Sequence, residues 1–120
     1  MHDTDEERMF KKVLEWLFGP RVDSIEGREL AGRLKADDPP FVLDVRLPME
    51  FRQGHIPGAH LIPLGEVGRR LHEIPKDREI VTVCRSGHRS MAAAQQLLKA
   101  GFTVKNLVGG MSVWNGPTKR

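Results

Sequence analysis

The sequence predicts an α/β protein whose sheet is mainly parallel. Short apolar runs typical of strands alternate along the chain with segments of helical periodicity, the pattern of repeated strand–helix units. The runs at 41–45 and 80–83 are almost continuously apolar, as expected of strands that are buried on both faces. A length of 120 residues is that of one ordinary domain. We therefore expect one parallel sheet with helical connections.

Residues 1–20 predict a helix over 3–18 that precedes the alternating part of the chain. Its apolar side chains recur at helical spacing in one stripe, formed by Phe10, Val13, Leu14 and Leu17. Acidic residues occupy the first turn, where they favour a helix, and Gly19-Pro20 ends it. Trp16 and Phe18 lie outside the stripe. We expect this helix to pack on the domain's own core, and docking of a partner is the alternative.

The rest of the chain alternates between strands and helices. Clusters of Pro, Asp and Lys at 37–40 and 75–77 mark turns between them. No helix or strand is assigned to the Pro- and Gly-rich stretch 47–58 or to the short turn at 109–114. In order, the expected elements are a short apolar piece with Val22 and Ile25, a helix over 26–36, strands over 41–45 and 60–62, a helix over 64–74, a strand over 80–83, a helix over 90–100 and a strand over 102–107.

The composition excludes several classes of protein. Hydrophobic residues make up 39% and charged residues 29%, as in globular domains, and no apolar run approaches the roughly 20 residues that span a bilayer. The acidic N-terminus lacks the order of a signal peptide, so we expect a cytoplasmic protein with no membrane partner. The net charge of +3 is dispersed rather than gathered in a stripe with stacking aromatics, so we expect no nucleic-acid partner.

The chain has a single cysteine, Cys84, which excludes an internal disulfide and a Cys-rich zinc site. Cys84 follows the strand at 80–83 and opens a loop that leads into a helix, where open α/β sheets bind ligands. Backbone N–H groups of such a loop and of the helix N-terminus can form an anion cradle. Arg85 and Arg89 add positive charge, and His88 can add more. These features favour the thiolate over a thiol of ordinary pKa, about 8.5, and predict a nucleophile.

Two reactions fit a thiolate in a basic cradle. In one, the thiolate takes the outer sulfur of an anionic donor such as thiosulfate and forms a persulfide, which an acceptor then removes. In the other, a phosphate ester is hydrolysed through a phosphocysteine. Four residues separate Cys84 from Arg89, so the ring of donors is small. A small ring suits a single terminal sulfur better than a tetrahedral phosphate.

The motifs together resemble the rhodanese family of sulfurtransferases, most closely its single-domain, thiosulfate sulfurtransferase-like members. The resemblance extends from about Asp23 to Trp114 and implies the family's fold, a central, mainly parallel five-stranded sheet with helices on both faces. Related dual-specificity phosphatases have one more residue in the loop, which agrees with the size argument for sulfur. The matching pieces, in the family's order, are Leu43-Asp44-Val45-Arg46, Glu50-Phe51, Gly54-His55-Ile56-Pro57-Gly58-Ala59, the loop Cys84 to Ser90, and Gly109-Gly110-Met111 followed by Trp114.

The resemblance also implies roles for individual residues. Cys84 would carry the persulfide. One of Arg85 and Arg89 would orient the donor and the other would pair with a carboxylate, for which Asp44 is the natural candidate, while Arg46 and Glu50 would pair with each other. The substrate cradle would consist of Arg85, Ser86, Gly87, His88, Arg89 and Ser90, and the supporting residues would be Asp44, Arg46 and Glu50.

The sequence therefore predicts an N-terminal helical extension at 1–20, a single rhodanese domain at 21–116 and a frayed tail at 117–120. The expected function is transfer of sulfane sulfur from thiosulfate or a persulfide donor to cyanide or a thiol, with no cofactor and no metal. The expected partners are a small anionic donor and an acceptor, either a protein or a small thiol. The alternatives are a sulfur-relay module fed by a partner protein, a phosphatase or oxyanion reductase, and a non-catalytic interaction domain.

Overall fold

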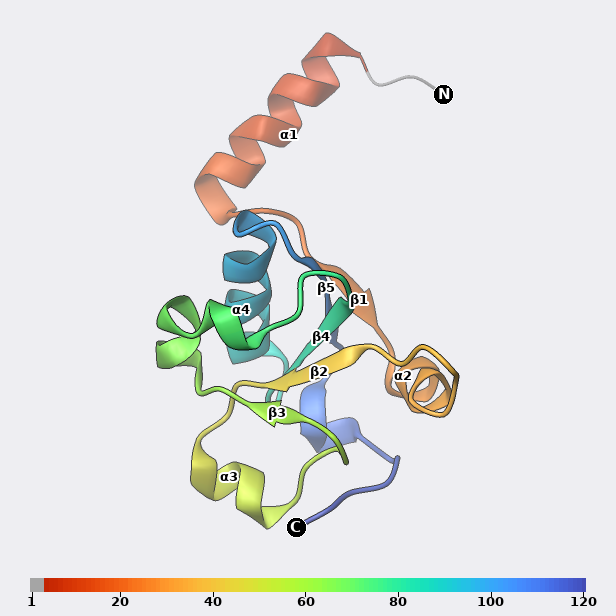
Figure 1. The fold of residues 1–120 in the computed structure, drawn as a ribbon. Coiled ribbons are helices and arrows are strands. Elements are labelled where there is room, and N and C mark those ends of the chain that lie inside the picture. Colours follow the sequence, from red (N-terminus) through yellow and green to blue (C-terminus); the bar gives the residue numbers. More distant parts are fainter. Residues whose placement is uncertain (1–3) are drawn as a thin grey trace.

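The computed structural model describes residues 4–120 and contains one five-stranded sheet (Figure 1). Its strands lie in the order β1-β5-β4-β2-β3, and every pairing among them is parallel. The predicted five-stranded α/β fold is confirmed. The strands are β1 (Asp23–Ile25), β2 (Phe41–Asp44), β3 (His60–Leu61), β4 (Glu79–Val83) and β5 (Thr103–Leu107).

Helices cover both faces of the sheet and enclose two apolar cores. On one face, α4 (His88–Lys99) packs its buried Leu97 against strand residues such as Ile80. On the other face, α2 (Gly27–Arg33) contributes the buried Leu30. Burial of each such leucine contributes roughly 1.5–3 kcal/mol to folding. Because successive strand residues point to opposite faces, residues of β4 alternate between the two cores.

Two connections differ from the sequence prediction. The segment 64–74 forms two short 3-10 helices, η1 (Leu64–Arg69) and η2 (Leu71–Glu73), in place of one α-helix. Gly65 and Gly68 weaken α-helical propensity there. Conversely, the Pro- and Gly-rich stretch contains a short helix, α3 (Pro48–Gln53). Proline is compatible with the first helical position that Pro48 occupies, and the carboxylate of Glu50 accepts a hydrogen bond from the Leu47 N–H at 3.1 Å.

The C-terminal end of the chain is held against the domain. The 3-10 helix η3 (Gly110–Val113) precedes Trp114, whose indole N–H donates to the carbonyl of Pro117 at 3.0 Å. The tail at 117–120 is expected from the sequence to fray, but Lys119 exchanges two backbone hydrogen bonds with His55, at 2.8 and 2.9 Å. A backbone partner far away in the sequence is therefore available to the tail.

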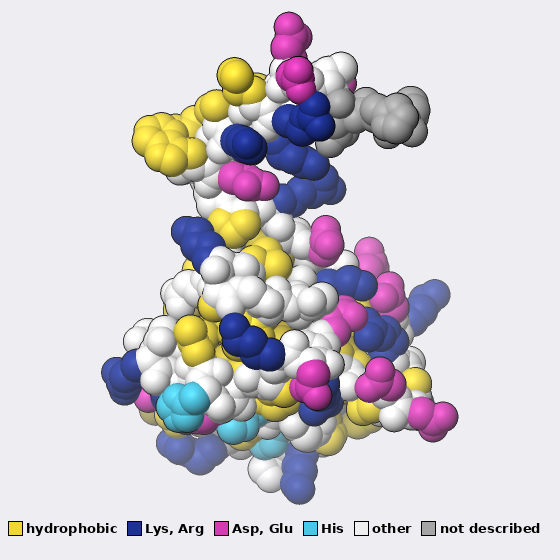
Figure 2. Space-filling view, turned by 45° about the horizontal axis from the view of Figure 1, so that its top comes forward, with side chains coloured by type: hydrophobic (Ala, Val, Ile, Leu, Met, Phe, Trp, Pro, Cys, Tyr) yellow, Lys and Arg dark blue, Asp and Glu magenta, His cyan; other side chains and the backbone are white. Residues whose placement is uncertain are grey.

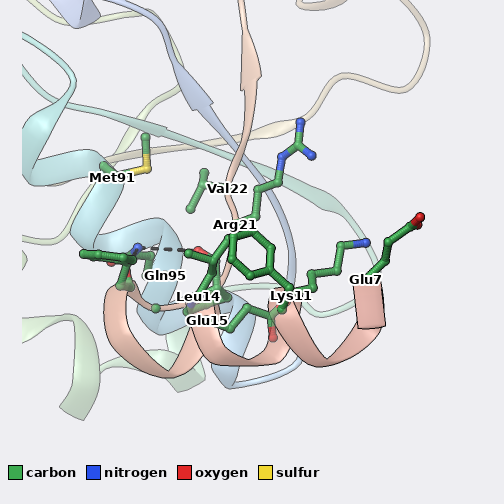
Figure 3. Close-up of a pocket in the computed structure, with 12 residues that line it drawn as sticks. Glu7, Lys11, Leu14, Glu15, Arg21, Val22, Met91 and Gln95 are labelled. Atoms are coloured by element: carbon green, nitrogen blue, oxygen red, sulfur yellow. Dashed lines mark hydrogen bonds between the residues drawn. The ribbon is translucent and has the colours of Figure 1, made fainter. Parts of the chain in front are cut away.

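The N-terminal helix α1 (Asp5–Phe18) projects away from the sheet (Figure 1). None of its residues is buried, so the expectation that it packs on the domain's core was wrong. An apolar groove of about 570 Å³ lies between α1 and α4 (Figure 3). Gln95 of α4 donates to the carbonyl of Phe18 at 2.9 Å. Between residues 4 and 120, no helix has the length and apolar character needed to cross a bilayer.

Candidate active site

Cys84 lies at the centre of the candidate site, directly after the central strand β4. Its side chain is completely buried, with an exposed fraction of 0%. The sulfur accepts a hydrogen bond from the backbone N–H of Gly87 at 3.0 Å and another from the Ser90 hydroxyl at 3.2 Å. Donors that point at a sulfur atom stabilise its charged form. Donors of the loop and of α4 thus converge on the Cys84 sulfur and favour its charged form.

The surroundings of Cys84 have opposing effects on the pKa of its thiol. Burial raises the pKa, because it disfavours the charged thiolate. The Ser90 hydroxyl lowers it, as do the backbone N–H groups of Ser86, Gly87 and Ser90, and together these donors outweigh burial. The pKa is thus lowered from its ordinary value, in the predicted direction. The lowering comes from these hydrogen bonds rather than from the arginine charges that the sequence emphasises.

Arg89 forms a two-point ion pair with Glu50 of α3. Its two terminal nitrogens contact the two carboxylate oxygens at 2.7 and 2.9 Å. The hydrogen bonds from Arg89 lower the pKa of the Glu50 carboxyl to about 2, although partial burial opposes them. The sequence predicts that one loop arginine is braced by a carboxylate, and this is correct. The predicted partner, Asp44, was wrong, because α3 carries Glu50 to the loop.

Asp44 is paired with Arg46 instead, two residues away. The Arg46 Nε lies 2.9 Å from one carboxylate oxygen and its terminal nitrogen lies 2.8 Å from the other. Both side chains are buried, and Arg46 also donates to the carbonyl of Gly54 at 2.8 Å. The predicted pairing of Arg46 with Glu50 was therefore wrong. This pair ties the end of β2 to the segment after α3 and supports the neighbourhood of the loop.

The remaining loop side chains face outward. Arg85, Ser86 and His88 are exposed, and the Ser86 hydroxyl lies 3.1 Å from the His88 ring nitrogen Nδ1. Within residues 4–120, Arg85 has no carboxylate partner, whereas Arg89 has one. Two cavities flank the loop, with volumes of about 370 and 300 Å³. Arg85 lines the first, and Ser86 and His88 line the second.

Sequence reasoning missed three residues that hold the loop from behind. Asn106 of β5 donates to the Gly87 carbonyl at 3.0 Å, and Thr82 of β4 lies beside Asn106. Thr82 interrupts the apolar run 80–83, and that irregularity is a signal that the sequence offers, whereas Asn106 follows Lys105 in a mixed strand and gives no such signal. Gly110 forms the third support, since its backbone lies against that of Cys84 and Arg85. The Gly109-Gly110 pair is visible in the sequence, but only the fold shows what it approaches.

No group of three or more potential metal ligands comes together in the part of the chain that the structure describes.

Comparison with known proteins shows the family to which the chain belongs. Residues 27–117 match the rhodanese-like domain. A sulfurtransferase of Allochromatium vinosum is 40% identical over 94 residues, which cover 78% of this chain and 88% of that protein.

The chain is also similar to a plant protein and to an archaeal protein of known structure. The Arabidopsis thaliana protein named thiosulfate sulfurtransferase 16, chloroplastic, is 43% identical over 93 residues, which cover 64% of this chain and 78% of that one. The crystal structure of a rhodanese-related protein from Thermoplasma volcanium aligns with a TM-score of 0.76 and 30% identity, over 82% of this chain and 98% of that chain.

Proposed function

The chain belongs to the rhodanese-like domain family, and we propose that it is a sulfurtransferase in which Cys84 takes the outer sulfur of thiosulfate. Two of its relatives carry names that support this: one is named a sulfurtransferase and the other a thiosulfate sulfurtransferase. The acceptor in the second half of the reaction is a thiophile, either cyanide or a thiol. The location that we propose is the cytoplasm.

The reaction balances without a cofactor. The Cys84 thiolate attacks the outer sulfur of thiosulfate and forms a new S–S bond, and the original S–S bond breaks, with its electron pair leaving on sulfite. The product is a Cys84 persulfide anion. Cyanide or a thiolate then attacks the outer sulfur of the persulfide, which regenerates the Cys84 thiolate. No net oxidation or reduction of the protein is required over the cycle.

The observation that carries this proposal is the pair of hydrogen bonds on a buried sulfur. The Gly87 N–H and the Ser90 hydroxyl both donate to Cys84, at 3.0 and 3.2 Å. A structural cysteine in a core behaves as a small hydrophobe and needs no donors. In the proposed reaction, these donors stabilise the Cys84 thiolate before attack and again when it is regenerated as the leaving group.

The burial of Cys84 favours sulfur transfer over phosphate-ester hydrolysis. When the reactant is thiosulfate, only its terminal sulfur atom has to reach the completely buried sulfur of Cys84. Phosphoryl transfer requires a tetrahedral phosphorus with three further oxygens at the same point. The four-residue interval between Cys84 and Arg89 leaves a narrow ring for that purpose.

We assign attraction of the donor to Arg85. It is exposed beside a cavity of about 370 Å³ and has no carboxylate partner within residues 4–120, while Arg89 is neutralised by Glu50. Replacing Arg85 with Ala is expected to raise the KM for thiosulfate several-fold, with a smaller change in kcat. Arg28→Ala, which removes an exposed arginine on α2, serves as the matched control and is expected to leave the KM unchanged.

The test of the function is thiocyanate formation from thiosulfate and cyanide. The wild-type chain is expected to turn over, and Cys84→Ser is expected to abolish turnover, because a serine hydroxyl is not ionised at neutral pH. Circular dichroism and thermal unfolding would establish that the variant remains folded. Turnover retained by folded Cys84→Ser protein would refute the persulfide mechanism.

A further inference from the structure

The side chain of Asn106 contacts the loop from behind, on the side opposite the reacting sulfur. Asn106 lies on β5 next to Thr82 of β4, in register, and both belong to the face that α4 covers. Only 4% of Asn106 is exposed and none of Thr82 is. A buried amide costs free energy unless it is fully hydrogen-bonded, so its presence in an apolar core needs an explanation.

The hydrogen bonds around Asn106 determine how its amide is oriented. Its Nδ2 donates to the carbonyl of Gly87 at 3.0 Å, and its Oδ1 accepts from the Thr82 hydroxyl at 3.3 Å. Because a backbone carbonyl can only accept, the amide nitrogen must be the atom that faces Gly87. The Thr82 hydroxyl, which also lies 3.4 Å from the Lys105 carbonyl, supports that orientation from the other side.

Gly87 needs such an anchor because of its own backbone. Its φ is +101°, a region that glycine enters freely and that is easily left, since no side chain restrains the torsions. The N–H of this residue points at the Cys84 sulfur, and its carbonyl points at Asn106. The carbonyl also accepts the first hydrogen bond of α4, from Met91 N–H at 3.2 Å. That bond holds the helix, and the Asn106 bond ties the same peptide to the sheet.

We propose that Asn106, supported by Thr82, is a positioning residue that holds the Gly87 N–H on the Cys84 sulfur. This inference rests on the proposed function, since it assigns Asn106 to the control of the reacting thiolate. Asn106 acts through Gly87 and does not touch the substrate. Its contribution is to fix a donor before the reaction begins, so that no reorganisation is needed when charge develops on the sulfur.

The test replaces Asn106 with Leu, which has nearly the same size and cannot donate. The thiolate is titrated by its ultraviolet absorbance, measured as the difference from Cys84→Ser protein. We expect the titration of Asn106→Leu to shift to higher pH and persulfide formation from thiosulfate at neutral pH to slow by about tenfold, the effect typical of one lost hydrogen bond. Asn115→Leu, the same substitution at an exposed site, is the control and is expected to change neither quantity.

A second, milder variant keeps the test decisive if Asn106→Leu protein does not fold. Thr82→Val leaves the Asn106 donor in place and removes the support of its amide, so we expect a smaller shift in the same direction. A folded Asn106→Leu protein that titrates like the wild type would overturn the proposal, as would unfolding of both variants. The titration requires no sulfur transfer, so it still decides the role of Asn106 if thiosulfate proves not to be a donor.

Discussion

The acidity of the Cys84 thiol depends on the hydrogen-bond donors around its sulfur. Of these donors, the Ser90 hydroxyl can be removed by a substitution that leaves the backbone unchanged. Ser90 is completely buried in the first turn of α4, and its side chain reaches the sulfur at 3.2 Å. The backbone donors of the loop remain when this hydroxyl is deleted. The Ser90 hydroxyl therefore contributes a separable part of the stabilisation of the thiolate.

Replacing Ser90 with Ala is expected to raise the pKa of the Cys84 thiol, because a donor that favours the thiolate is lost while burial stays. Persulfide formation at neutral pH should slow about 10- to 100-fold, since a hydrogen bond to a charged group contributes about 1.5–3 kcal/mol. The rate of alkylation of Cys84, followed across pH, measures the shift. A pH profile that coincides with that of the wild type would contradict the assigned role.

The ion pair between Glu50 and Arg89 predicts a dependence of stability on pH. The Arg89 hydrogen bonds lower the pKa of Glu50 from 4.5 to about 2. The folded state thus binds this proton less readily than the unfolded chain, so the pair stabilises the fold fully above pH 4.5 and loses its contribution as pH falls from 4.5 to about 2.

Glu50→Gln is expected to lower the free energy of unfolding at neutral pH by about 1 kcal/mol, as for a partly exposed pair. The difference between wild type and variant should shrink as the pH falls through that window. Urea denaturation of both proteins at several pH values measures it. A difference that stays constant down to the lowest pH would show that the carboxylate charge is not what stabilises the fold.

The sequence predicts which residues form the site better than it predicts their partners. Cys84 and the loop follow from local features, namely a strand end, a glycine and a helix start. The partner of Arg89 lies 39 residues away in a helix of six residues that the local pattern did not indicate. Pairing over such a distance is determined by tertiary packing, so the sequence alone favoured the wrong carboxylate.

At the scale of elements, the C-terminal turn supports the reactive loop. The N–H groups of Met111 and Ser112, in η3, donate to the carbonyls of Cys84 and Arg85, each at 2.8 Å. Gly110 makes this approach feasible, because a Cβ at that position would lie 2.3 Å from the Cys84 carbonyl oxygen. The turn formed by η3 is therefore part of the framework of the candidate site.

Gly110→Ala is expected to destabilise the fold and to disturb the loop. A residue with a side chain at its φ of +56° costs about 1–3 kcal/mol, and the backbone contact adds to that. Gly32→Ala is the matched control, because nothing lies within 4 Å of an added Cβ there. This control should stabilise α2 by about 0.5–1 kcal/mol. Thermal unfolding of the two variants measures the contrast, and equal midpoints would refute the close approach at Gly110.

The elements themselves were predictable to different degrees. The apolar run at 80–83 and the Ala- and Leu-rich segment after the loop correspond to β4 and α4, because burial favours their residues in those conformations. The helix begins two residues earlier than predicted, at His88, where Gly87 adopts a left-handed conformation that ends the loop. Such a boundary depends on backbone torsions that a polar segment does not reveal.

At the scale of the whole molecule, the rhodanese-like domain carries a projecting helix. The molecule measures 50 × 31 × 26 Å, and α1 extends it along the longest direction (Figure 1). Hydrophobic side chains lie on the surface of α1 beside lysines and arginines (Figure 2). The sequence correctly predicted this helix and its apolar stripe, but an amphipathic pattern does not reveal whether the stripe is covered.

The exposure of α1 can be checked by fluorescence, because the chain has two tryptophans in contrasting places. Trp16 on α1 is 83% exposed, whereas Trp114 is buried in a core. Most of the emission quenched by iodide should therefore come from Trp16, and Trp16→Phe is expected to shift the remaining emission to shorter wavelength. Weak quenching in the wild type would mean that α1 packs against another surface in solution.

Intact-protein mass spectrometry after incubation with thiosulfate, without an acceptor, tests the central claim most directly. The mechanism predicts that the wild-type chain gains the mass of one sulfur atom, that cyanide removes it, and that Cys84→Ala protein gains nothing. No gain by folded wild-type protein with an ionised thiol would contradict the transfer from thiosulfate and favour a persulfide supplied by a partner protein. A gain that persists in Cys84→Ala protein would contradict the assignment of the nucleophile.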